Sequence, residues 1–201
     1  MSIAEAAVPS MPKLYALHPA RITVEQYHAM GEAGILTPDD RVELLEGVIE
    51  KKPVKEPLHV KTVKLLMRRL SKCLSPTMHA TRKDPVTLID SEPEPDVSVL
   101  LGTIDDYADR HPSGSDCLLV IEVADTSLAR DTFKASAYAA GGVPEYWIVD
   151  LTGRTFVVHR KPTADGYADI TIAAEASIDL PGGAFRVAID DLVQQPENPP
   201  Q

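Results

Sequence analysis

Two acidic residues and one lysine stand out in this chain because of the apolar segments around them. Asp96 comes directly before the apolar run 97–101, Glu122 lies near the end of the apolar run 117–123, and Lys134 follows in a segment of helical composition. Carboxylates in apolar runs are costly to bury unless they are paired or coordinate a metal ion. Two strand carboxylates followed by a helical lysine therefore suggest metal-dependent phosphodiester chemistry.

Asp96 and Glu122 are expected to lie side by side at one end of a sheet. Their apolar runs are typical of buried strands, and the polar segment 102–116 connects them. If the strands are neighbours, the two carboxylates repel each other unless a cation or a shared proton lies between them. Magnesium takes one or two carboxylates and completes its shell with water and phosphate oxygens. We therefore expect Asp96 and Glu122 to bind Mg²⁺, with Mn²⁺ as a substitute.

Lys134 is expected to approach these carboxylates from the next helix. Residues 129–140 have a strong helical composition that stops at Gly141 and Gly142. Asp131 and Lys134 share one face of this helix. A cation at this place can orient the attacking water or stabilise the negative charge that develops at phosphorus.

The order of these residues resembles the PD-(D/E)xK nuclease superfamily and, more narrowly, the Uma2 (Uma-two) family of putative restriction endonucleases. The resemblance covers about residues 22–192. It rests on Glu43-Leu-Leu-Glu-Gly47, His59, Glu122-Val, Asp131-x-x-Lys134 and Gly142-Val-Pro-Glu-Tyr-Trp-Ile-Val-Asp150.

This resemblance implies an α/β fold, an α+β mixed sheet with flanking helices around a restriction-endonuclease-like core. It also implies a hydrolase, a magnesium-dependent endonuclease that cleaves DNA with Asp96, Glu122 and Lys134 as catalytic residues. Glu43 is implied as a third carboxylate at the metal. One position departs from the superfamily pattern, because Ala124 stands where the lysine two residues after the strand glutamate is expected. Lys134 must then supply the amine.

Each of these residues also has a structural interpretation. A Pro-Asp pair such as Asp96 is common in turns, a helical lysine is often solvated, and Glu43 fits the polar face of an ordinary strand. His59 faces inward on its helix, either as a core histidine or as a residue that lines the site, and Asp131 is a further candidate for lining it.

The competing hypothesis is a catalytically inactive binding or scaffold protein that keeps the nuclease fold. The acidic charge and Ala124 favour it, and it predicts no metal dependence. Under the nuclease hypothesis, we expect Lys134→Ala to abolish cleavage and to spare the fold.

The distribution of charge bears on whether the partner is DNA. The net charge of −10 is unfavourable for a protein that binds phosphates. Residues 41–83, however, contain eleven Lys or Arg and four Glu, a local charge of +7 that leaves −17 on the rest of the chain. A basic face beside the active site could therefore hold a DNA backbone. Cleavage of both strands usually needs two active sites, so a homodimer is a candidate assembly.

Length and composition predict one nuclease-like domain. With 201 residues, 44% of them hydrophobic, the chain can bury one sizeable core. We expect a flexible N-terminal segment at 1–20, a single domain at 21–193 and a polar tail at 194–201. The sequence lacks an apolar stretch of eighteen or more residues, and Cys73 and Cys117 have no metal-ligand spacing. These features favour a cytoplasmic protein without membrane insertion.

The remaining pattern gives a coarse order of elements. Thr23 is expected to cap a helix that ends near Gly31, and a hairpin is expected at 42–50 with its turn at Glu46-Gly47. Further predicted elements are an amphipathic helix at 59–74, one or two strands at 77–89, a hairpin of 145–151 with 155–160, and a strand at 167–173.

Overall fold

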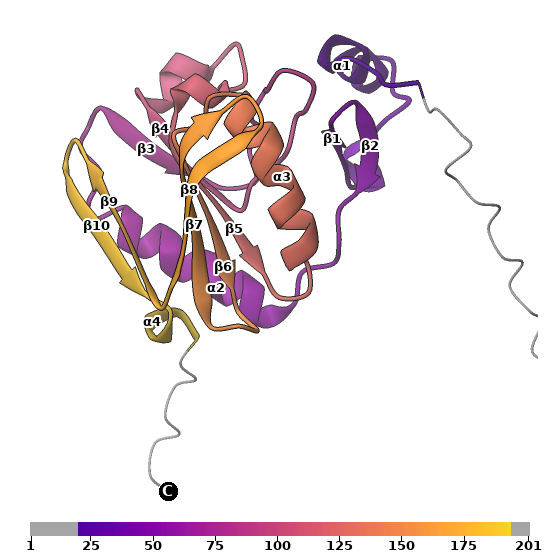
Figure 1. Cartoon of the computed structure of the whole chain (residues 1–201). Coiled ribbons are helices and arrows are strands. Elements are labelled where there is room, and N and C mark those ends of the chain that lie inside the picture. Colours follow the sequence, from indigo (N-terminus) through magenta and orange to yellow (C-terminus); the bar gives the residue numbers. More distant parts are fainter. Residues whose placement is uncertain (1–19, 194–201) are drawn as a thin grey trace, which may run out of the picture.

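The computed structural model describes residues 20–193, and its centre is a six-stranded mixed sheet (Figure 1). In spatial order the strands are β3 (Met78–Thr81), β4 (Val97–Leu101), β5 (Cys117–Ala124), β6 (Glu145–Asp150), β7 (Thr155–Thr163) and β8 (Gly166–Ala173). All neighbouring strands are antiparallel except β5 and β6, which are parallel. The predicted class, an α+β mixed sheet with flanking helices, is confirmed.

The parallel pair at the centre explains why β5 and β6 are almost continuously apolar. Helix α3 (Leu128–Ala140) connects the two strands and covers one face of the sheet. Strands that are covered on both faces have no solvent side on which polar residues would be favourable. Glu122 is the exception in β5, where it pairs with Ile148 of β6 and is only 4% exposed. Such a buried carboxylate requires partners.

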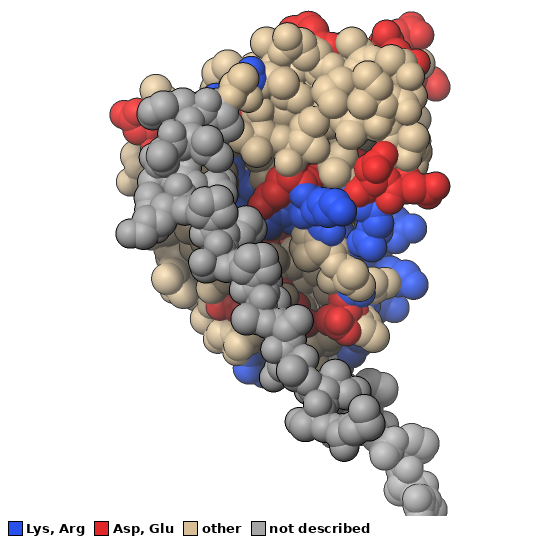
Figure 2. Space-filling model, turned by 90° about the vertical axis from the view of Figure 1, so that its right-hand side faces the viewer, with Lys and Arg blue, Asp and Glu red and all other residues tan. Residues whose placement is uncertain are grey.

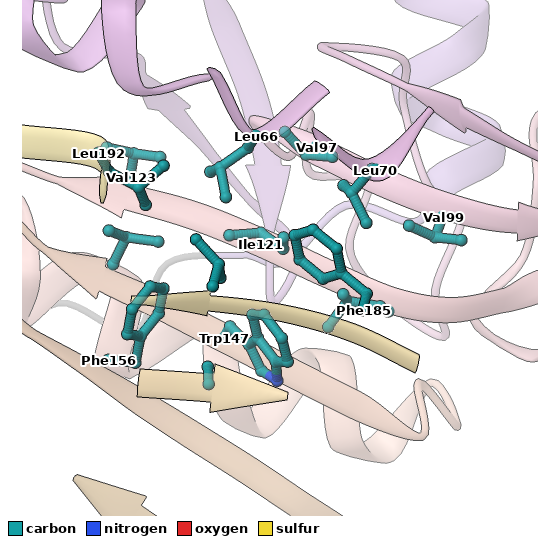
Figure 3. Close-up of a cluster of buried hydrophobic side chains, with 14 of the residues drawn as sticks. Leu66, Leu70, Val97, Val99, Ile121, Val123, Trp147, Phe156, Phe185 and Leu192 are labelled. Carbon is teal, nitrogen blue, oxygen red and sulfur yellow. The ribbon is translucent and has the colours of Figure 1, made fainter. Parts of the chain in front are cut away.

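The opposite face of the sheet carries the larger core. Helix α2 (Pro57–Leu70), the hairpin of β9 (Glu175–Leu180) with β10 (Gly183–Ala188), and the short helix α4 (Asp190–Val193) contribute to it. Figure 3 shows side chains from α2, the central strands and β10 meeting in one cluster. Within it, the rings of Trp147 and Phe185 stack with their centroids 6.0 Å apart.

The N-terminal part of the described chain forms a small unit beside the sheet. It consists of α1 (Val24–Glu32), a 3-10 turn (Pro38–Asp40) and the hairpin of β1 (Val42–Leu45) with β2 (Val48–Lys51). Thr23 caps α1 as predicted, since its hydroxyl accepts a hydrogen bond from the Gln26 amide. The hairpin turns at Glu46 and Gly47, whose φ angles of 46° and 72° suit the turn that joins twisted strands.

Several boundaries differ from the sequence predictions. Helix α2 begins at Pro57, which is favourable at a first helical position, and it ends at Leu70 rather than Leu74. Of the one or two strands expected within 77–89, one forms, β3, and Thr87 adds an isolated bridge to Ser113. The hairpin β9–β10 and helix α4 were not predicted.

The sequence predictions also cover the two ends of the chain and membrane insertion. The expected flexible segment, apart from its last residue, and the expected polar tail lie outside the described residues. Among the helices of residues 20–193, none combines the length and the apolar character needed to cross a membrane.

Candidate active site

The structure brings Asp96 and Glu122 together at one end of the sheet. Strands β4 and β5 are antiparallel neighbours, with Val97 opposite Ile121, so Asp96 lies beside Glu122. The Asp96 amide donates to Glu122 Oε2 at 3.2 Å, and the Val123 amide donates to Asp96 Oδ2 at 2.9 Å. The side-by-side arrangement expected from the two apolar runs is therefore present in the fold.

Lys134 reaches this pair from α3. Its Nζ lies 2.8 Å from Glu122 Oε1 and 2.9 Å from Glu43 Oε1, and its side chain is 4% exposed. One turn further along α3, the Tyr138 hydroxyl donates to the same Glu122 oxygen at 3.2 Å. A helical lysine thus places its ammonium beside the strand glutamate, although Ala124 occupies the position that the superfamily pattern gives to lysine.

Glu43 extends the site to the N-terminal hairpin. This residue of β1 is 1% exposed, and it binds Arg130 Nη2 at 2.7 Å as well as Lys134. Arg130 also binds Glu50 of β2 through Nε at 2.8 Å. Sequence reasoning missed Arg130, although its spacing of four residues from Lys134 places both cations on one helix face.

His59 and Lys55 surround Asp96 from the other side. His59 lies in the first turn of α2, where its Nε2 is 2.8 Å from Asp96 Oδ2. Its Nδ1 is buried and has no hydrogen-bond partner among the described residues. Lys55 forms an ion pair with Asp96 Oδ1. Lys55 was also missed, because it lies in the irregular segment between β2 and α2, where no periodicity marks it.

Asp131 lines the same space from the first turn of α3. It is 4% exposed and accepts a hydrogen bond from the Ser127 hydroxyl at 2.6 Å. The Tyr146 hydroxyl donates to the Asp131 carbonyl at 2.8 Å, which ties this turn to β6. The structure therefore places all the candidate residues from the sequence around one space.

These side chains enclose a cavity of about 50 Å³, which is enough for an ion or a water molecule. Its lining includes seven acidic residues and four Lys or Arg, so the cavity has an excess of negative charge. A wider cleft of about 1150 Å³ adjoins it, and Lys52 and Glu94 line both spaces. The Lys52 ammonium lies 2.6 Å from Glu94 Oε2 and forms the border between the two spaces.

The two carboxylates have opposite pKa shifts. Burial alone would raise the pKa of Asp96, but the hydrogen bond from His59 and the charge of Lys55 outweigh it and lower the pKa to about 2. Burial raises the pKa of Glu122 to about 8, because the repulsion from Asp96 adds to it and the attraction of Lys134 offsets it only in part. Such divergence within one cavity is common at catalytic sites.

Lys134 is a permanent positive charge in this site. Burial disfavours the ammonium form, but Glu122 and Glu43 outweigh this effect and raise the pKa of Lys134 above its ordinary value. Lys134 is therefore suited to act through its charge rather than as a base.

The donor set fits a hard divalent cation. Asp96, Glu122 and Glu43 offer carboxylate oxygens, which Mg²⁺ prefers, in a cavity with an excess of negative charge. The ammonium groups of Lys55 and Lys134 already contact these carboxylates. The Lys55 side chain is 22% exposed at the edge of the cavity, so it can move away from Asp96 when a cation binds.

We expect the stability of the metal-free protein to fall as the pH rises from about 5 to about 8 because of Glu122. Its folded-state pKa of about 8 exceeds its ordinary value of 4.5, so between these values the folded state holds a proton that the unfolded state has lost. Asp96 does not contribute to this slope, since its pKa is lowered and its stabilisation is complete above its ordinary value of 3.8.

Urea unfolding of the wild type and Glu122→Gln at both ends of this pH range measures the effect. The variant should lose less stability than the wild type, by a difference of a few kcal/mol. Equal pH slopes in the two proteins would show that Glu122 has no raised pKa.

A family model described as Uma2, putative restriction endonuclease, matches residues 24–187. Among solved structures, the crystal structure of a putative nuclease belonging to DUF820 from Anabaena variabilis ATCC 29413 is similar, with a TM-score of 0.67 and 20% sequence identity. The match covers 86% of this chain and 97% of that chain. No curated protein matches the sequence significantly.

Proposed function

Because this chain belongs to the Uma2 family of putative restriction endonucleases, we propose that it is a magnesium-dependent endonuclease that hydrolyses phosphodiester bonds in DNA. The observation that carries the proposal is the contact of Lys134 with Glu122 and Glu43 next to Asp96, inside one buried cavity. Burying these charges is costly, and catalysis gives a reason for that cost.

Asp96 and Glu122 are the proposed ligands of Mg²⁺, with Glu43 as the third carboxylate. When bound, the ion would supply a water of lowered pKa and positive charge for the phosphate. Glu43 has a second role in the proposal, because its contacts with Lys134 and Arg130 hold both cations in place. Mn²⁺ should substitute for Mg²⁺, since both ions accept carboxylate oxygens.

Lys134 is proposed to orient the attacking water and to stabilise the negative charge that develops at phosphorus. Its ammonium is fixed by two carboxylates and needs no reorganisation during the reaction, the condition under which a charge is most effective in catalysis. His59 is a positioning residue, because its hydrogen bond holds Asp96 Oδ2. Asp131 lines the cavity beside them.

The DNA backbone is proposed to lie along α2. A groove of about 630 Å³ follows this helix, and Lys55, Lys61, Lys64 and Arg68 line it. Because Lys55 also contacts Asp96, the basic groove begins at the proposed catalytic carboxylate. Figure 2 shows Lys and Arg side chains gathered beside a group of Asp and Glu on the face that carries α1 and the β1–β2 hairpin.

Lys64→Ala combined with Arg68→Ala is expected to weaken DNA binding without changing the fold. Both side chains are exposed, and each contributes about one phosphate contact, so the slope of log K against log salt should become less steep by about two. Fluorescence anisotropy with a labelled duplex over a salt series measures this slope. Lys161→Ala is the matched control, because Lys161 is exposed on β7. An unchanged slope in the double variant would exclude α2 as the binding face.

Incubation of the purified protein with supercoiled plasmid tests the activity itself. Nicked or linear product should appear with Mg²⁺ or Mn²⁺, disappear with EDTA, and be absent from Glu122→Gln. The alternative is a catalytically inactive nuclease-fold binding or scaffold protein, which Ala124 favours. That protein would bind the duplex and leave the plasmid intact with every divalent ion.

Cleavage of both DNA strands usually requires two active sites, so we propose a homodimer, which light scattering of the purified protein would detect as twice the chain mass. The predicted cytoplasmic location stays a prediction, with which the free thiols of Cys73 and Cys117 agree.

A further inference from the structure

We propose that His28, Glu92 and His111 form a second metal site, separate from the nuclease cavity, for a borderline divalent ion such as Zn²⁺. One ligand atom from each residue lies within 4.8 Å of the other two. None of the three lines the nuclease cavity. The proposal does not depend on the nuclease function.

The three residues come from segments that are far apart in the sequence. His28 lies in α1, Glu92 in the segment between β3 and β4, and His111 in the connection between β4 and β5. His28 Nε2 is 2.7 and 2.8 Å from the two oxygens of Glu92. The rings of His28 and His111 meet edge to face, with centroids 6.1 Å apart.

Glu92 differs from the buried carboxylates of the nuclease cavity. Glu43, Asp96 and Glu122 each form an ion pair with Lys or Arg, whereas the only ion pair of Glu92 within residues 20–193 is with His28. Glu92 is nevertheless 4% exposed, and Thr87 donates its hydroxyl to Glu92 Oε2 at 2.8 Å. A buried carboxylate that pairs with histidine rather than with Lys or Arg is a candidate ligand for a cation.

The ligand types indicate which cation. Two imidazoles and one carboxylate form a set that zinc accepts, with a fourth position left for water or substrate. The hydroxyl of Thr87 would serve as an outer partner that orients the carboxylate. A hard ion such as Mg²⁺ prefers oxygen ligands and suits the carboxylates of the nuclease cavity better.

Small movements are enough to complete the geometry. Zinc bonds of about 2.0 to 2.2 Å place tetrahedral ligand atoms roughly 3.3 Å apart. The contact of 2.7 Å between His28 and Glu92 is shorter than this, and the ligand atom of His111 lies within 4.8 Å of both. His111 is exposed and lies in a connecting segment, so its side chain can approach by rotation.

The position of the site suggests what the ion would do. His28 and His111 line the cleft of about 1150 Å³ that borders the nuclease cavity at Lys52 and Glu94. One imidazole belongs to α1 and the other to the β4–β5 connection, so zinc would fasten these two walls of the cleft together.

Zinc titration calorimetry of the full-length chain without an affinity tag tests the proposal, with Co²⁺ absorption as a second measurement. The wild type should bind one equivalent of Zn²⁺ and give intense tetrahedral Co²⁺ bands. His28→Ala and His111→Ala should each lower the affinity for this Zn²⁺ ion by at least about tenfold. Both variants should also lose the tetrahedral Co²⁺ bands. Loss of exposed His111 should leave the fold intact, which circular dichroism checks.

Two controls separate this site from others. His79→Ala removes a partly buried histidine of β3 and should bind Zn²⁺ like the wild type. Glu122→Gln alters the nuclease cavity and should also retain the equivalent. A wild type that does not bind Zn²⁺ would overturn the proposal, and so would a His111→Ala variant with unchanged affinity. Loss of the equivalent in Glu122→Gln would instead assign the ion to the nuclease cavity.

Discussion

Lys134→Met is expected to reduce DNA cleavage by at least about 10²- to 10³-fold, the usual cost of removing one fixed charge-stabilising group from an active site. Methionine keeps most of the length of lysine and loses the ammonium that contacts Glu122 and Glu43. Plasmid nicking under identical Mg²⁺ concentrations measures the effect.

The same substitution is expected to destabilise the fold, but by less than the roughly 3 to 5 kcal/mol lost when a buried charge is left with no partner. Glu122 loses its cation, whereas Glu43 keeps its contact with Arg130. The expectation from sequence that Lys134→Ala spares the fold stays a prediction, and the burial of this side chain argues against it. The side chain is in fact 4% exposed and joins two carboxylates.

A double variant separates the two effects. Adding Glu43→Gln to Lys134→Met removes a carboxylate that has lost one of its two cations, so stability should recover in part while cleavage stays absent. Urea unfolding and nicking assays on the same preparations give both quantities. A folded Lys134→Met protein that cuts plasmid at the wild-type rate would refute the role of Lys134.

Trp147→Ala is expected to cost about 3 to 5 kcal/mol of unfolding free energy, the range for removing a large aromatic side chain from a core. Trp147 is fully buried in β6, its ring packs on Phe156 and Phe185, and its Nε1 donates to Glu145 Oε1 at 2.6 Å. Chemical denaturation followed by circular dichroism measures the loss.

Phe133→Ala is the matched control for Trp147. Phe133 is an aromatic residue of α3 that is 53% exposed, so its loss should cost much less than that of Trp147. Similar costs for the two substitutions would mean that the stacked cluster of β6 and β10 does not form as described.

The central strands and the two strand carboxylates could be predicted because their signals are local. An apolar run bounded by turn residues indicates a buried strand, and a carboxylate inside it requires compensation wherever the strand lies. The position of Lys134 could not be predicted from its local sequence alone, because a single helical lysine is usually solvated. Its role was predicted from the order of the motif, and the structure shows the contact with Glu122 that the order implied.

The parts that sequence reasoning missed depend on how distant segments pack. Strands β9 and β10 alternate apolar with polar residues, but only the packing of Phe185 on Trp147 shows where the hairpin belongs. Lys55 reaches Asp96 because of the path that the irregular segment between β2 and α2 takes, and no sequence pattern predicts that path. The cluster of His28, Glu92 and His111 joins three segments that no spacing rule connects.

The most direct test of the proposed active site is Mg²⁺ titration calorimetry of the wild type and Asp96→Asn, with plasmid incubation of the same samples. Asparagine has the same shape as aspartate but lacks the charge that contacts Lys55 and His59. We predict that the wild type binds Mg²⁺ and nicks plasmid, and that the variant, still folded, does neither. Nicking by Asp96→Asn at the wild-type rate, or a wild type that binds no Mg²⁺, would contradict the assignment of Asp96 and Glu122 as the metal-binding catalytic pair.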